Sequence, residues 1–82
     1  MYNYQEEKPK IFIEENQKQF LKCRDIVAKL PDLFIMWEVL NKVGGDSWLL
    51  MAYVDRLVEL GEIIEVKQSD YVAGQNRLFK KL

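Results

Sequence analysis

The stretch DSWLLMAYVDRLVELGEII, residues 46–64, decides the fold of this 82-residue chain. Apolar side chains recur in it at spacings of three and four, the period of one helical face, and this stripe consists of Leu50, Tyr53, Val54, Leu57 and Leu60. Asp46 or Ser47 suits the N-cap of that helix. Gly61 suits its end, because glycine adopts the left-handed backbone conformation without a Cβ clash. The stretch therefore predicts an amphipathic helix that ends at a glycine.

Two strands are predicted after this helix. The residues EIIEV, 62–66, have strand-like composition, with Ile64 and Val66 on one side and Ile63 on the other. A polar turn region follows, and RLFKKL, 77–82, predicts a returning strand. Two short antiparallel strands are marginal by themselves, so we expect this hairpin to pack against helices.

A first helix is predicted over residues 17–30. Its apolar residues form one stripe, which consists of Phe20, Cys23, Val27 and Leu30. Asn16 suits the N-cap, and Pro31 ends the helix because it forces the preceding residue out of helical geometry.

A second helix is predicted through LFIMWEVLNKV, residues 33–43. Asp32 suits its N-cap, and the pair Gly44–Gly45 stops it. The expected buried face consists of Met36, Val39, Leu40 and Val43. With the hairpin, these three helices predict a mainly α domain that carries a small antiparallel β hairpin.

The first sixteen residues predict an N-terminal arm, partly extended or disordered, ahead of a domain over residues 17–82. Residues 1–10 are polar and contain Pro9. The segment KIFIEE, 10–15, fits a short strand or the lead-in to the first helix. We favour an extended segment, because Ile11 and Ile13 share one face at period two.

The end of the chain resembles a known family. YVDRLVELGEIIEV and GQNRLFKKL are similar to the third-helix, first-strand and closing-strand signature of winged-helix domains, with matches at Leu57, Leu60, Gly61, Ile63, Arg77 and Phe79. In that family a leucine-rich helix ends at a glycine, and a hairpin called the wing closes with a basic–aromatic strand. The resemblance covers residues 17–82. It implies a winged helix-turn-helix domain, a three-helix bundle plus a two-stranded wing, like those of transcription regulators.

Members of this family often bind double-stranded DNA, with the third helix in the major groove and the wing on the backbone. By position, the resemblance implies a DNA-binding set of Ser47, Trp48, Arg56, Lys67, Arg77 and Lys80. Base edges favour Arg, Lys, Asn and Gln, and the third helix supplies only Arg56 of these. The net charge of −1 also lacks the positive footprint of most nucleic-acid binders. The resemblance favours a small DNA-binding module with little base readout.

An alternative is a protein–protein interaction or dimerisation module that keeps the fold without reading DNA. The second and third helices carry more apolar residues than one buried stripe needs, and such a surplus marks interfaces when it is exposed. The candidate interface residues are Phe34, Ile35, Trp37, Leu49 and Ala52. Another protein or a second copy of the chain, as a homodimer, would then be the partner.

The composition gives little support to catalysis, and we expect no enzyme, cofactor or metal site. The chain has no histidine to act as a general base, and its single cysteine, Cys23, lies on the inward stripe of the first helix. A zinc site would need four nitrogen or sulfur ligands. No uncharged apolar run, residues 33–37 included, is long enough to span a bilayer. One cysteine also fits a reducing compartment, so we expect a cytoplasmic protein without a membrane partner.

Overall fold

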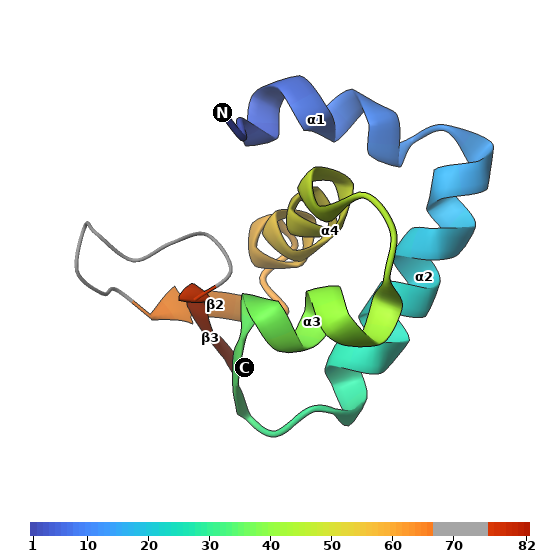
Figure 1. The fold of residues 1–82 in the computed structure, drawn as a ribbon. Coiled ribbons are helices and arrows are strands. Elements are labelled where there is room, and N and C mark those ends of the chain that lie inside the picture. The colour runs from blue at the N-terminus through green and yellow to red at the C-terminus, as the bar shows by residue number, and fades with distance from the viewer. Residues whose placement is uncertain (67–75) are drawn as a thin grey trace.

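The computed structural model describes residues 1–66 and 76–82. Within them the chain forms four helices and a three-stranded antiparallel sheet. The elements in chain order are α1 (Tyr4–Ile11), α2 (Glu14–Lys29), β1 (Leu33–Ile35), α3 (Met36–Val43), α4 (Ser47–Glu59), β2 (Ile63–Val66) and β3 (Leu78–Lys81). Helix α4 runs through the middle, with α1 above it, α2 on the right and α3 below in the view of Figure 1. This arrangement confirms a mainly helical chain with antiparallel strands.

Helix α1 replaces the predicted arm, and the expectation of an extended or disordered segment over residues 1–16 was wrong. The Asn3 side chain caps the helix by accepting a hydrogen bond from the Gln5 backbone N–H (2.9 Å). Pro9 lies inside the helix, where its missing N–H removes one backbone hydrogen bond. Tertiary packing overrides that cost, because α1 lies along α4 and buries Ile11. No helix in the described part of the chain has the length and apolar character needed to cross a bilayer.

Helix α2 has the predicted inward stripe, and it begins two residues before the predicted cap. Its N-cap is Ile13, while the Asn16 side chain donates instead to the Lys10 carbonyl (2.8 Å). Cys23 and Val27 are buried, as predicted. At the other end, the Lys81 ammonium of β3 donates to the Ala28 and Leu30 carbonyls and so satisfies acceptors at the end of the helix.

The predicted second helix is in fact a short strand followed by a short helix. Residues 33–35 form β1, and α3 begins only at Met36, so Asp32 is not its N-cap. The Glu38 carboxylate instead accepts a hydrogen bond from the Ile35 backbone N–H (3.1 Å) at the start of α3. Successive side chains of a strand point to opposite faces of the sheet, so Phe34 is buried and its neighbour Leu33 is exposed.

The sheet has the strand order β1-β3-β2, so the predicted two-stranded hairpin gains a third strand. Phe34 lies opposite Phe79, and Glu65 lies opposite Phe79 on the other side. As predicted, Ile63 and Ile64 lie on opposite sides of β2, and the structure buries Ile63 and exposes Ile64.

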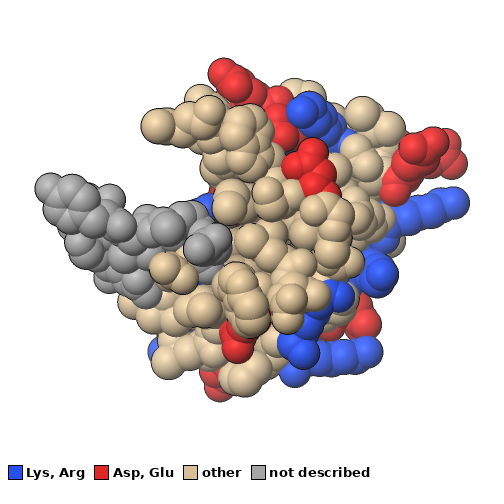
Figure 2. Space-filling model, viewed as in Figure 1, with Lys and Arg blue, Asp and Glu red and all other residues tan. Residues whose placement is uncertain are grey.

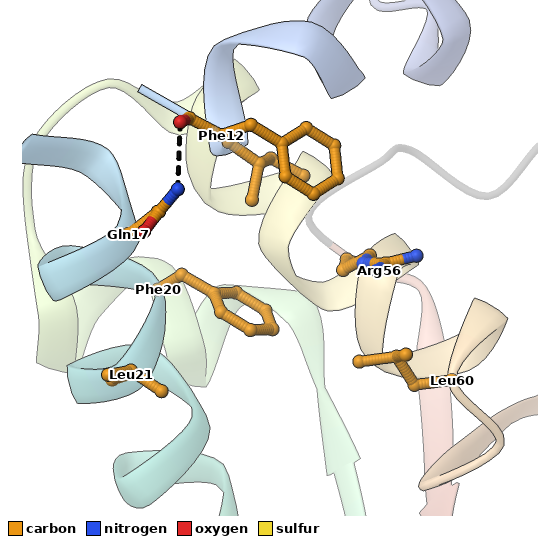
Figure 3. A pocket seen from close by; sticks show the side chains of 7 residues that line it. Phe12, Gln17, Phe20, Leu21, Arg56 and Leu60 are labelled. Atoms are coloured by element: carbon orange, nitrogen blue, oxygen red, sulfur yellow. Dashed lines mark hydrogen bonds between the residues drawn. The ribbon is translucent and has the colours of Figure 1, made fainter. Parts of the chain in front are cut away.

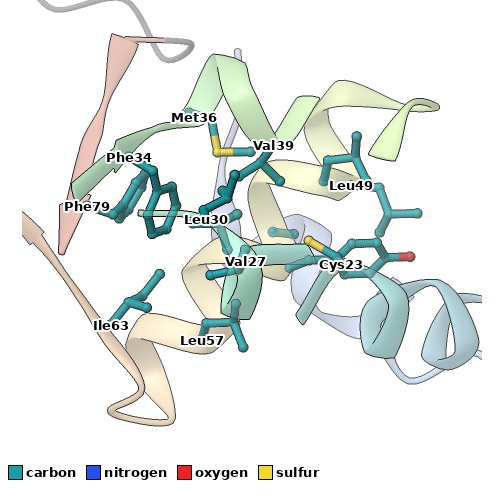
Figure 4. Close-up of a cluster of buried hydrophobic side chains, with 14 of the residues drawn as sticks. Cys23, Val27, Leu30, Phe34, Met36, Val39, Leu49, Leu57, Ile63 and Phe79 are labelled. Carbon is teal, nitrogen blue, oxygen red and sulfur yellow. The ribbon is translucent and has the colours of Figure 1, made fainter. Parts of the chain in front are cut away.

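The core lies between the inner face of this sheet and the four helices. The rings of Phe34 and Phe79 stack at 5.6 Å between centroids, and Figure 4 shows them side by side. Met36 and Leu57 lie in the same cluster, from α3 and α4. Helix α4 contributes most of the buried side chains, which are Leu49, Leu50, Ala52, Tyr53, Val54 and Leu57. Leu60, predicted to belong to this stripe, is exposed at the end of the helix.

Candidate functional site

Helix α1 covers the outer flank of α4, the side that the family resemblance assigns to a DNA groove. The Tyr2 hydroxyl donates to Asp55 Oδ2 at 2.5 Å, and the Tyr4 hydroxyl donates to Glu59 Oε1 at 3.0 Å. Lys8 Nζ forms an ion pair with Glu59 Oε2 at 2.9 Å. Contacts from α1 and from Tyr2 just before it therefore reach two successive turns of α4, and Figure 1 shows α1 lying across α4.

Of the predicted interface residues, three are buried inside the chain itself. Leu49 and Ala52 are buried in the core cluster on α4, the helix that α1 covers, and Phe34 is buried against Phe79. The prediction that they form an exposed patch was wrong, because their side chains pack into the chain's own core. Ile35 is half-buried on the outer face of the sheet, and only Trp37 is largely exposed.

Arg77, a predicted DNA contact, is held by two carboxylates of its own chain. Its Nη2 lies 2.7 Å from Asp55 Oδ1 and 2.8 Å from Glu65 Oε1, and its Nε lies 2.9 Å from Glu65 Oε2. These hydrogen bonds raise the pKa of the guanidinium, and the hydrogen bonding to Glu65 contributes most. The guanidinium also lies over the Phe79 ring, 5.1 Å from its centroid. Its charge is therefore compensated within the chain.

The other predicted DNA contacts that the structure describes lie on two different elements, α4 and β3. Ser47 and Trp48 are exposed at the start of α4, where the Asp46 side chain caps the helix through the Trp48 N–H. Lys80 is exposed on the outer face of the sheet, opposite Leu33 and Ile64. Lys67 lies outside the described residues. Among those that are described, only Lys80 is a cation, so Ser47, Trp48 and Lys80 do not form a cationic surface.

Few cations lie over the centre of the face that Figure 2 shows. Figure 2, drawn from the same side as Figure 1, shows uncharged residues over the centre of this face, across α4 and α3. Most Lys and Arg side chains visible on this face lie near its right and lower edges. A DNA backbone laid across the start of α4 would meet few cations here, and phosphate contacts supply most of the affinity of nucleic-acid binders.

A pocket of about 230 Å³ opens where the end of α1 meets α2 and α4. Its lining residues come from all three helices and are Ile11, Phe12, Gln17, Phe20, Leu21, Arg56 and Leu60. Figure 3 shows Phe12 at the top, Phe20 and Leu21 on one wall, and Arg56 and Leu60 on the other. Apart from Gln17 and Arg56, every lining side chain is apolar.

Arg56 is the one cation of this pocket lining. Its Nη1 donates to Glu59 Oε1, and its guanidinium lies over the Phe12 ring, 5.4 Å from the centroid. Glu59 also accepts from Lys8 and Tyr4, so a single carboxylate faces two cations. Hydrogen bonds from Lys8, then from Arg56, lower the pKa of Glu59 to about 2. This group of charges carries one net positive charge beside an apolar pocket.

The sequence holds only part of the signal for this pocket. Leu21 stands outside the inward stripe of α2, and Phe12 and Ile13 are adjacent apolar residues in a polar region. All three are exposed in the structure, and so is Leu60. Phe12, Leu21 and Leu60 meet at the pocket because the chain bends between α1 and α2, and the sequence pattern did not predict this bend.

The single cysteine of the chain, Cys23, is buried. Burial raises the pKa of the Cys23 thiol to about 12, so the thiol stays protonated near neutral pH. No three His, Cys, Asp or Glu side chains in the described ranges cluster closely enough to hold a metal ion.

Comparison of this chain with protein-family models, with curated proteins and with solved structures finds no match. No known relative therefore indicates the function of this chain.

Proposed function

We propose that this chain is a non-catalytic protein-interaction module with a winged-helix fold. The order of α2, α3 and α4 followed by the strands β2 and β3 supports the winged-helix assignment. The interaction role accords with a compact domain that exposes large apolar side chains at its surface, among them Phe12, Leu21 and Leu60 around the pocket.

One observation carries the proposal: α1 lies over the flank of α4 that would otherwise enter a DNA groove. The same flank presents Asp55 and Glu59, whose charge has the wrong sign for phosphates. The two arginines nearest to it, Arg56 and Arg77, are engaged by carboxylates of the chain. An interaction module needs neither a cationic surface nor a free groove-binding helix.

DNA binding is the competing proposal, and a specific observation favours it. Ser47 and Trp48 stay exposed at the start of α4, and Lys80 is exposed on β3. A helix start can contact a phosphate through its backbone N–H groups.

A direct test separates the two proposals. Fluorescence anisotropy with a labelled mixed-sequence duplex at 50 mM salt should detect no binding by the full chain. In parallel, cross-linking of the tagged chain in the cells that encode it should capture a stoichiometric protein partner. Duplex binding that weakens steeply with salt, and weakens further in Lys80→Ala, would contradict the interaction proposal and support the DNA-binding one.

A further inference from the structure

We propose that the pocket between α1, α2 and α4 binds one large apolar side chain of a partner protein, with a neighbouring carboxylate of the partner on Arg56. The inference rests on the proposed interaction function and specifies its site and the chemistry of its partner. The pocket is defined by the seven lining residues given above.

The size of the pocket matches a side chain better than a free small molecule. Pockets for small-molecule ligands occupy roughly 300–1,000 Å³, and this one measures about 230 Å³. A dry cavity of about 150 Å³ already accepts a benzene ring. The pocket is therefore large enough for a leucine, methionine or phenylalanine side chain delivered from a partner chain.

The rim of the pocket can bury further apolar surface around that side chain. Phe12, Leu21 and Leu60 line the pocket, and each keeps about half of its surface exposed. In Figure 3 they lie around the opening between the two helical walls. Hydrophobic anchors ringed by contacts that exclude water carry most of the binding energy in protein interfaces.

The charge at the pocket sets the second requirement for the partner. Of the five N–H donors of Arg56, the described contacts use one nitrogen, Nη1, toward Glu59. Glu59 keeps Lys8 and Tyr4 as partners, so it does not depend on Arg56 alone. The guanidinium of Arg56 lies over the Phe12 ring, beside the opening of the pocket. A carboxylate next to the anchor would therefore find donors already positioned for it.

A peptide selection on the full chain tests the proposal. A random twelve-residue display library should yield peptides with a large apolar residue and an Asp or Glu within four positions. Leu21→Lys should weaken the selected peptide about 30-fold or more, the size expected for loss of an anchor contact. The matched control is Leu33→Lys, because Leu33 is 55% exposed on the sheet and Leu21 is 58% exposed at the pocket. This control should bind as the unmodified chain does.

The carboxylate contact has its own test. Replacing the acidic residue of the peptide by its amide should weaken binding about tenfold to the unmodified chain. Arg56→Gln should remove the difference between the acidic and amide peptides, a coupling that a merely structural role of Arg56 would not produce. Circular dichroism spectra should show that each variant keeps its helices.

Each other outcome overturns the pocket proposal in a recognisable way. If selected peptides lose affinity for Leu33→Lys and not for Leu21→Lys, the chain is an interaction module and the pocket is not its site. If light scattering shows a dimer that Leu21→Lys makes monomeric, the occupant is a second copy. If no peptide is selected and duplex DNA binds, the pocket proposal and the proposed function both fail.

Discussion

The hydroxyl of Tyr2 donates a hydrogen bond to Asp55 Oδ2 at 2.5 Å, although 53 positions separate the two residues in the chain. The other oxygen of Asp55 accepts from Arg77 Nη2 at 2.7 Å. One carboxylate of α4 therefore joins the segment before α1 to the segment that leads into β3. This junction explains why an acidic residue lies on a helix flank that a DNA-binding role would leave cationic.

Removing the Tyr2 hydroxyl should loosen α1 more than it destabilises the whole domain. Burial, followed by the hydrogen bond to Asp55, raises the pKa of Tyr2, which keeps the hydroxyl protonated as a donor. Tyr2→Phe should lower the free energy of unfolding by about 1 kcal/mol. Hydrogen exchange should quicken first in residues 4–11. Tyr4→Phe is the matched control, since its bond to Glu59 is exposed and its loss should matter less. Equal effects of both changes would contradict this view of the junction.

Asp55→Asn tests the ion pair at the same junction. The side chains of Asp55 and Arg77 are only 15% and 18% exposed, so the lost charge leaves a partly buried guanidinium less well compensated. We expect the free energy of unfolding to fall by about 2 kcal/mol, read from urea denaturation. Glu65→Gln removes the charge of the other partner of Arg77. The Glu65 side chain is 42% exposed, so this change should lower the free energy of unfolding by less than about 1 kcal/mol. The opposite ranking would mean that Glu65 is the main partner.

Two neighbouring residues at the start of α4 should respond very differently to the same substitution. Leu49 is 8% exposed and Trp48 is 43% exposed. Leu49→Glu places a charge in the core and should lower the free energy of unfolding by about 3 kcal/mol or more. Trp48→Glu should change it by less than about 1 kcal/mol, because an acidic residue in the first turn of a helix is favourable. Thermal unfolding of both variants checks the contrast, and a Leu49→Glu protein as stable as the unmodified chain would contradict the burial of Leu49.

The elements with a regular apolar period could be predicted from the sequence. The apolar stripes of α2 and α4 and the alternation of Ile63 and Ile64 in β2 predict burial directly, and the structure confirms them except at the exposed Leu60. The cap at Asp46 also follows from a local rule and is confirmed by its hydrogen bond to the Trp48 N–H.

The missed elements depend on contacts between distant residues. Strand β1 has three residues, too few to show a period, and its partner β3 lies more than forty positions later. Helix α1 is polar and contains Pro9, so local propensity opposes it, and its packing on α4 stabilises it. The apolar surplus at Phe34 and Leu49 was visible in the sequence. It was assigned to a partner because the sequence did not predict that Phe34 belongs to a strand or that Leu49 packs into the core.

Acid should destabilise the protein through the carboxylates that hold its cations. Hydrogen bonds from Lys8 and Arg56 lower the pKa of Glu59 to about 2, and Arg77 lowers the pKa of Glu65. An unfolded glutamate titrates near pH 4.3, so the unfolded state takes up protons first as the pH falls. The stabilisation is complete above about pH 5 and is lost as the pH falls toward 2. The urea concentration at the midpoint of unfolding should stay constant from pH 7 to about pH 5 and then fall as the pH is lowered to 2.5. Glu59→Gln should decline less steeply below pH 5, whereas parallel profiles would show that Glu59 contributes nothing to the acid sensitivity.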